Sequence, residues 1–135
     1  MCAHWTELIS ASQFDGLLRK VADVLEESGV SFVRLTGTSS NRSNQLDSFQ
    51  SGGDRVLLLN VADESAAGSN LTVANHVIFL SPLITEEAQQ YHATMEQARG
   101  RAIRFGQTKE VHIHRFVAID TIDQSTYENR EQKTL

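Results

Sequence analysis

The sequence predicts an α/β domain with a mainly parallel central sheet flanked by helices, and two observations lead to this prediction. Signals for helices and strands alternate along the 135 residues, which favours helices layered on a sheet over an all-helical or all-β protein. Residues 56–61 form a near-continuous apolar run, a pattern typical of a central parallel strand that is covered on both faces. Without repeats or an internal boundary, one domain is expected over residues 1–135.

The first helix is predicted by apolar residues at helical spacing between a cap at Ser12 and a stop at Gly29. The residues with this spacing are Phe14, Leu17, Leu18, Val21, Val24 and Leu25. Before the helix, residues 7–11 could form a short strand, but they are polar and few for a central position. We therefore expect a ragged N-terminal edge over residues 1–11.

A short strand and a weaker helix are expected next. The strand is predicted at residues 31–35, and the hydroxyl-rich turn at 36–40 leads from it into a helix that carries Leu46 and Phe49. This helix is expected to end at Ser51-Gly52-Gly53.

After the strand at 56–61, two further strands and two helices are expected. Another strand is predicted at 76–80, and Thr85 could cap a helix whose first turn holds Glu86 and Glu87, where the helix dipole favours acidic side chains. The last strand is predicted by alternation over 111–117. A C-terminal helix over about 122–134 is predicted because Thr121 and Gln124 resemble a capping box.

Composition narrows the class of protein. The net charge of -5 argues against bulk electrostatic adhesion to nucleic acid or to acidic membranes. The single cysteine, Cys2, fits a reducing compartment. No apolar run reaches the roughly 18 residues that a membrane span needs, and the N-terminus lacks the pattern of a signal peptide. We expect a soluble intracellular protein without a membrane partner.

The segment 97–107 is the most informative part of the chain, because it places three arginines and two glutamines around two glycines. Arg101 and Arg104 are three residues apart, so on a helix they would project from one face and could fork onto a terminal phosphate. An arginine of this kind can stabilise the charge that builds up during phosphoryl transfer. The alternative interpretation is a solvated basic helix end.

Two polar segments follow predicted strands, at the edge where ligands collect in open α/β sheets. In residues 63–72 the small residues would let the backbone approach a phosphate, and Ser65, Asn70 and Thr72 could donate hydrogen bonds. In residues 36–40 the side-chain hydroxyls and the free N–H groups at the start of the helix could bind a phosphate. The alternatives are an ordinary polar loop and an ordinary helix cap.

Several other chemistries are disfavoured. Asp63 and Glu64 end an apolar run, as the acidic pair of P-loop enzymes does, but no Gly-Lys pair occurs in the sequence. His112 and His114 lie on one face of a strand and could share a metal, but no third ligand has a suitable spacing, so no metal site is predicted. No Gly-x-Ser-x-Gly elbow supports a serine hydrolase.

Three segments, in their order along the chain, carry a resemblance to a known family. They are the turn Thr36–Thr38, the segment 63–72 ending in Asn-Leu-Thr, and residues 97–107, which match Gln-x-x-Gly-Arg-x-x-Arg-x-Gly-Gln at every fixed position. Over about residues 12–130 the chain resembles the C-terminal ATPase lobe of Swi/Snf-related, helicase-like DNA translocases of superfamily two, particularly their fungal branches.

The resemblance implies a RecA-like lobe, the second of two lobes that clamp ATP and Mg between them. The family's arginine fingers are matched by Arg101 and Arg104, with Gln97, Gly68 and Gly100 expected near the nucleotide. In this family duplex DNA is tracked mainly through its phosphate backbone. The residues that match its contacts are Thr36, Gly37, Thr38, Ser39, Ser65, Ala66, Ala67 and Asn70.

The resemblance also sets expectations for partners and activity. ATP and Mg would be held mainly by a first lobe, which this sequence lacks, so we expect the chain alone to hydrolyse ATP negligibly. Its expected partners are the double-stranded DNA backbone, a first lobe in cis or in trans, and chromatin, and its expected location is the nucleus. The alternative is an inactive lobe that serves only as a DNA- or protein-binding module. The chain departs from the family pattern in two places. The strand before the first helix is more polar than usual, and Arg99 replaces an apolar residue between Gln97 and Gly100, with Glu96 preceding them. These changes could weaken local packing or nucleotide contact.

Overall fold

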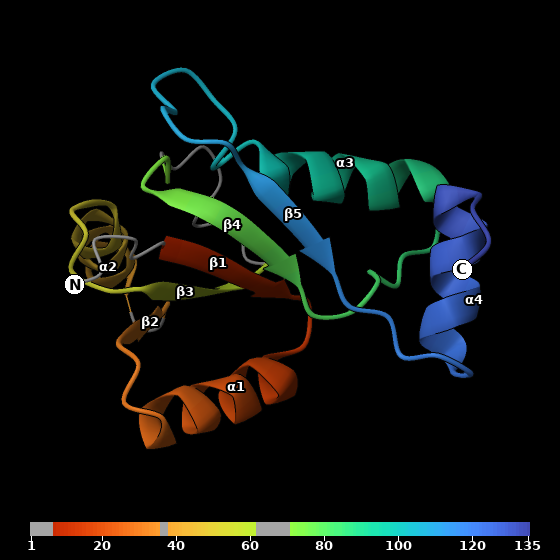
Figure 1. Ribbon diagram of the computed structural model, residues 1–135, viewed down its shortest axis with the longest axis horizontal. Helices are drawn as coiled ribbons and strands as arrows, with labels where there is room; N and C mark the ends of the chain where they lie inside the picture. Colours follow the sequence, from red (N-terminus) through yellow and green to blue (C-terminus); the bar gives the residue numbers. More distant parts are fainter. Residues whose placement is uncertain (1–6, 36–37, 62–70) are drawn as a thin grey trace.

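The computed structural model describes residues 7–35, 38–61 and 71–135. Helices and strands alternate in it as the sequence predicts (Figure 1). The elements are β1 Glu7–Ser12, α1 Asp15–Glu27, β2 Phe32–Arg34, α2 Ser39–Gln50, β3 Val56–Asn60, β4 Ala74–Phe79, α3 Ala88–Arg99, β5 His112–Arg115 and α4 Ile122–Glu131. None of the described helices is long and apolar enough to cross a membrane.

The five strands form one sheet in the order β2-β3-β1-β4-β5, and each neighbouring pair is parallel. The prediction of a mainly parallel sheet flanked by helices is therefore confirmed. Because the strands are parallel, their carboxyl ends share one edge of the sheet and their amino ends share the opposite edge. We call these the carboxyl edge and the amino edge.

The structure corrects the sequence-based view of β1, which was expected to be too polar and too short for a central position. β1 lies in the middle of the sheet, with Ile9 opposite Leu57 of β3 and Val77 of β4. Ile9 is fully buried, and Ser10 and Ser12 are buried as well. Ser12 is accommodated because its hydroxyl accepts a hydrogen bond from the backbone N–H of Phe14, at 3.0 Å.

Helices cover both faces of the sheet (Figure 1). On one face, α1 places Leu18 and Ala22 on Val56 and Leu58 of β3. On the other face, α2 and α3 pack against alternate residues of the strands, which is the side-chain arrangement expected of a strand covered on both faces. The buried residues of this larger core include Ile9, Ala11, Leu46, Phe49, Leu57, Leu59, Val77, Phe79, Tyr91, Met95 and Ala98.

The ends of the first two helices follow local chemistry, with one small difference from the sequence analysis. α1 begins at Asp15 after Phe14 rather than directly after Ser12. It ends where expected, since Gly29 has a φ of +71°, a conformation that glycine adopts without strain. Thr38 caps α2, because its hydroxyl accepts a hydrogen bond from the N–H of Asn41 at 3.3 Å.

The last two helices differ more from the expectation. The prediction that Thr85 caps a helix is wrong: α3 begins at Ala88, and the Thr85 hydroxyl instead donates to the carbonyl of Glu87 at 2.8 Å. Thr121 does cap α4 by accepting from the N–H of Asp123. Gln124 accepts from the N–H of Asp120, one residue earlier than a capping box requires.

Candidate functional site

The segment Gly100–Gln107, which we call the arginine loop, follows the last residue of α3, Arg99. It consists of turns, so the expectation that Arg101 and Arg104 project from one face of a helix is wrong. Arg101 is only 3% exposed and its carbonyl accepts a hydrogen bond from the N–H of Leu71 at 3.0 Å. Arg104 lies at the exposed tip of the loop. The structure therefore gives the two guanidinium groups different environments.

The arginine loop lies at the amino edge of the sheet. α3 starts beyond the end of β4 and runs back, so its last turn and the loop reach the start of β4 (Figure 1). The side chain of Gln107 donates to the carbonyl of Ala74, the first residue of β4, at 3.0 Å. Nearby, the ammonium of Lys109 lies 3.7 Å from the carboxylate of Glu7, the first residue of β1.

The tip of the arginine loop exposes apolar as well as basic side chains. Phe105 is fully exposed and Ile103 is 44% exposed. The turn is closed by a hydrogen bond of 3.0 Å from the N–H of Gln107 to the carbonyl of Arg104. Gly106 within this turn has a φ of +96°, which favours glycine. The tip thus presents Arg104 between two apolar side chains.

The structure describes one of the two glycines that are expected near a nucleotide. Gly68 lies outside the described residues. Gly100 ends α3, and a Cβ there would lie 3.2 Å from the carbonyl oxygen of Glu96. A side chain at position 100 would therefore need a small shift of the end of α3.

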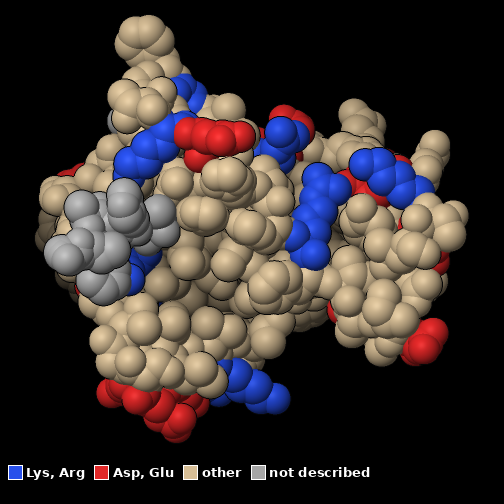
Figure 2. Space-filling view, viewed as in Figure 1, with Lys and Arg blue, Asp and Glu red and all other residues tan. Residues whose placement is uncertain are grey.

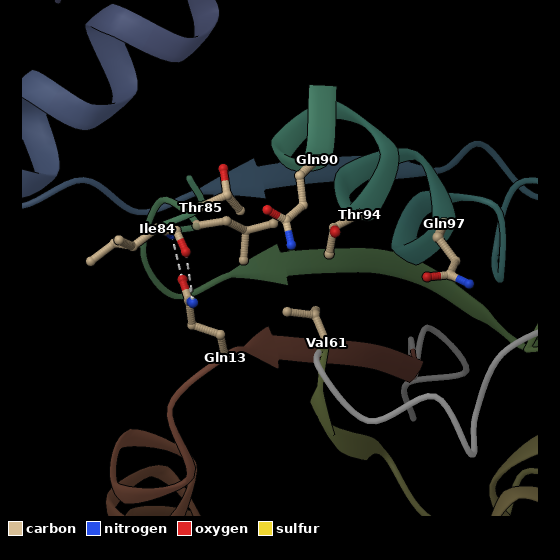
Figure 3. Close-up of a pocket in the computed structure, with 8 residues that line it drawn as sticks. Gln13, Val61, Ile84, Thr85, Gln90, Thr94 and Gln97 are labelled. Atoms are coloured by element: carbon tan, nitrogen blue, oxygen red, sulfur yellow. Dashed lines mark hydrogen bonds between the residues drawn. The ribbon is translucent and has the colours of Figure 1, made fainter. Parts of the chain in front are cut away.

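Gln97 belongs to a row of polar side chains on α3. The sequence analysis identified only Gln97 among them. Gln90, Thr94 and Gln97 are spaced i, i+4 and i+7, so they share one helix face, and they point towards Val61 (Figure 3). They line a cavity of about 290 Å³. Its other lining residues are Gln13, Val61, Leu83, Ile84 and Thr85.

Gln13, which follows β1, lines this cavity at the carboxyl edge. Its side-chain amide accepts from the N–H of Ile84 at 2.5 Å and donates to the carbonyl of Ile84 at 3.1 Å (Figure 3). The described residues of the lining are uncharged and contribute amide, hydroxyl and aliphatic groups. The spacing of the polar residues on α3 was a signal available in the sequence, whereas the approach of Gln13 to Ile84 depends on the strand order.

Of the eight residues expected to contact DNA, the structure describes Thr38 and Ser39. They lie at the start of α2, which follows the carboxyl end of β2. The cap interpretation of Thr38 is confirmed by its hydrogen bond to Asn41, and a cap does not prevent a phosphate contact. Thr36, Gly37, Ser65, Ala66, Ala67 and Asn70 lie outside the described residues. The two described candidates, Thr38 and Ser39, therefore lie at the carboxyl edge.

His112 and His114 have a third imidazole beside them that the sequence analysis missed. The ring of His76 stacks on those of His112 and His114, with centroids 4.9 and 5.3 Å away, and its Nδ1 lies 3.0 Å from Nε2 of His114. Burial, and then the charges of His112 and His114, lower the pKa of His76. Among the described residues, no group of three His, Cys, Asp or Glu side chains is arranged to hold a metal ion.

Charged side chains of both signs are mixed on the surface. On the face shown in Figure 2, Lys and Arg lie among Asp and Glu and form no continuous basic area over the described residues. At the end of α3, Arg99 pairs with Glu96 at 2.6 Å in an exposed ion pair. These two residues, which depart from the family pattern, thus pair with each other at the surface.

Comparisons with known proteins agree on one family. Residues 5–106 match the family described as "Helicase conserved C-terminal domain". The chain is 48% identical over 121 residues to the DNA (cytosine-5-)-methyltransferase DMT5 of Cryptococcus neoformans var. grubii, which covers 87% of this chain and 5% of that protein. It is 32% identical over 129 residues to the DNA repair protein rad8 of Schizosaccharomyces pombe, covering 94% of this chain and 11% of that protein.

A solved structure supports the same assignment. The C-terminal part of the Fun30 ATPase domain superposes with a TM-score of 0.78 at 27% identity, and the match covers 91% of this chain and 38% of that chain. The chain thus spans only a small part of the length of the relatives that it matches.

Proposed function

Because the chain belongs to the family of helicase conserved C-terminal domains, with relatives that are Swi/Snf-related helicases, we propose that it is the second lobe of an ATP-dependent DNA translocase. In this role it contributes arginines to a nucleotide held by another lobe. The observation that carries the proposal is the exposed position of Arg104 at the tip of a loop whose two ends are hydrogen-bonded to the domain.

The arginine loop fits a polyphosphate chemically. A guanidinium donates from a planar fork that matches phosphate oxygens, and it stays charged at all relevant pH values. ATP would supply the transferable γ-phosphoryl group. Arg104 would approach that group from outside, and buried Arg101 would support the loop and add positive charge behind it. Gln97 and Gly100 precede Arg104 in the chain, and we assign them to the surroundings of the nucleotide because the family resemblance implies it.

Magnesium and the remaining phosphate contacts are assigned to a first lobe. The described residues offer no group of three acidic or imidazole ligands for a metal ion, and the sequence has no Gly-Lys pair of a phosphate loop. The chain alone is therefore expected to turn over ATP negligibly.

We assign the DNA backbone to the carboxyl edge. Thr38 and Ser39 there would donate hydrogen bonds to phosphates, together with Thr36, Gly37, Ser65, Ala66, Ala67 and Asn70, as the family resemblance implies. With a net charge of -5, the chain would bind DNA through such local contacts rather than through its overall charge. A role in DNA repair or chromatin remodelling, in the nucleus, follows from the kinds of relatives found.

The similarity to a DNA methyltransferase does not bring methyl transfer into the proposal. That alignment spans 121 of the 135 residues, so it overlaps the helicase match at residues 5–106. The shared part is therefore helicase-like.

The test is DNA-stimulated ATP hydrolysis by the chain mixed with a separately purified first lobe of a Swi/Snf-related helicase. Arg104→Ala is expected to reduce turnover by a factor of about a hundred or more, because an arginine finger acts on the transition state. Arg99→Ala is the matched control, since Arg99 is a nearby, partly buried arginine that already pairs with Glu96. Arg101→Ala needs a parallel measurement of stability because Arg101 is buried.

Two results would count against the proposal. DNA-stimulated turnover by the chain alone would contradict the need for a first lobe. Equal turnover of wild type and Arg104→Ala in the mixture would remove the arginine role. If DNA binding persisted in that second case, the chain would be a binding module.

A further inference from the structure

Gln107 joins three backbone groups through its side chain, at the end of the arginine loop. Its Nε2 donates to the carbonyl of Ala74 at 3.0 Å and to the carbonyl of Ala102 at 2.9 Å. Its Oε1 accepts from the N–H of Lys109 at 2.9 Å. Both N–H groups of the amide and its oxygen are thus used. One side chain ties the loop to β4 and to the residues that follow.

The two carbonyl groups that Gln107 serves lie in the interior. Ala74 and Ala102 are both fully buried, so water cannot readily replace a lost donor. Leaving a buried carbonyl without a donor is costly. A residue of similar size that cannot donate would therefore be expected to loosen the loop rather than leave it in place.

Gln107 also closes the turn that Arg104 opens. Its backbone N–H donates to the carbonyl of Arg104 at 3.0 Å. At the other end of the loop, the carbonyl of Arg101 accepts from Leu71. Between these two attachments lies the exposed tip that carries Arg104.

We propose that Gln107 is a positioning residue that holds the arginine loop against the start of β4 and thereby fixes the direction of Arg104. The consequence for catalysis rests on the proposed function, because it requires Arg104 to reach a nucleotide. The order that Gln107 imposes on the loop can be measured without any nucleotide.

The first experiment measures backbone amide hydrogen exchange by NMR on the full chain carrying Gln107→Met. Methionine keeps the length and packing of the side chain and removes its hydrogen bonds. The amides at position 107 and at Leu71 are expected to exchange about ten times faster, since each reports one attachment of the loop. Amides of α1, such as that of Ala22, should keep their rates.

The matched control is Gln13→Met, which removes a glutamine side chain of the same kind at the opposite edge of the sheet. It should accelerate exchange at Ile84, to which Gln13 is bonded, and leave Leu71 unchanged. Unchanged exchange at position 107 and Leu71 in Gln107→Met would overturn the proposal. Equal acceleration in α1 would overturn it too, because it would indicate a general loss of stability.

The second experiment measures turnover with a first lobe present. Gln107→Met is expected to lower kcat about tenfold with KM for ATP nearly unchanged. The reason is that a misdirected Arg104 would no longer stabilise the transition state, whereas binding of ATP in the ground state would change little. If Arg104→Ala lowers kcat and Gln107→Met does not, the positioning role is wrong while the proposed function stands. If Arg104→Ala has no effect, the proposed function fails, and the exchange experiment alone decides whether Gln107 orders the loop.

Discussion

Gln13 and Ile84 are joined by two hydrogen bonds, from the N–H of Ile84 to Oε1 of Gln13 and from Nε2 of Gln13 to the carbonyl of Ile84. Gln13 follows β1 and Ile84 follows β4, two strands that are neighbours in the sheet. The side-chain amide therefore extends the pairing of these strands beyond their last residues. Ile84 lies before the start of α3 at Ala88, so this pairing fixes the segment that leads into the helix.

Replacing Gln13 with alanine is expected to lower the free energy of unfolding by about 1 kcal/mol, because two partly solvated hydrogen bonds are lost. Urea denaturation of the two proteins measures this difference. Gln90→Ala provides the control: Gln90 lines the same cavity but is exposed on α3, where alanine is a good helix former. Equal destabilisation by both substitutions would contradict a specific role for the Gln13–Ile84 pairing.

The sequence predicts most of this fold because its strongest signals are local. The apolar run at 56–61 became the buried strand β3, and the helical spacing from Phe14 to Leu25 became α1. β1 was misjudged because its place in the sheet depends on its pairing with β3 and β4. Strand order is a property of long-range contacts, so the polar serines of β1 gave no indication of it.

The candidate site was only partly predictable for the same reason. The arginines were identified from their spacing, but the helix on which they were placed ends at Arg99. Arg101 is buried and Arg104 is exposed, a difference that depends on the packing of the whole domain and that residue spacing does not reveal. Similarly, His76 meets His114 because β4 pairs with β5.

Gly106→Ala is expected to destabilise the domain by about 1–2 kcal/mol, because an alanine at a φ of +96° is strained. No atom lies within 4 Å of the position of the new Cβ, so the effect would come from the backbone alone. Gly16→Ala in α1 is the control, since it also meets no atom within 4 Å but lies in a helix. There alanine should be neutral or stabilising. Thermal unfolding of both variants distinguishes the two cases, and an unchanged Tm for Gly106→Ala would show that the turn relaxes.

The ion pair between Arg115 and Glu131 is expected to be important for holding α4. Glu131 is 10% exposed and Arg115 is 29% exposed in their side chains, and α4 itself has no buried residue. A double-mutant cycle with Arg115→Leu and Glu131→Gln should give a coupling energy of about 1–3 kcal/mol, because the pair is largely removed from water. The same cycle on Arg99 and Glu96, an exposed i,i+3 pair, should give about 0.5 kcal/mol or less. Equal coupling in the two cycles would mean that burial does not strengthen the first pair.

Stability is expected to fall in mild acid because of His76. Burial and the neighbouring imidazoles lower its pKa in the folded chain below the ordinary value of 6.5. Near and below pH 6.5 the unfolded chain therefore binds more protons at this residue than the folded chain, and acid favours unfolding. The contact between Nδ1 of His76 and Nε2 of His114 acts in the same direction, since two protonated rings would both present donors. Urea unfolding at pH 7.5, 6.5 and 5.5 should show a decline in the free energy of unfolding that is smaller in His76→Gln, and parallel pH profiles for the two proteins would rule out this role of His76.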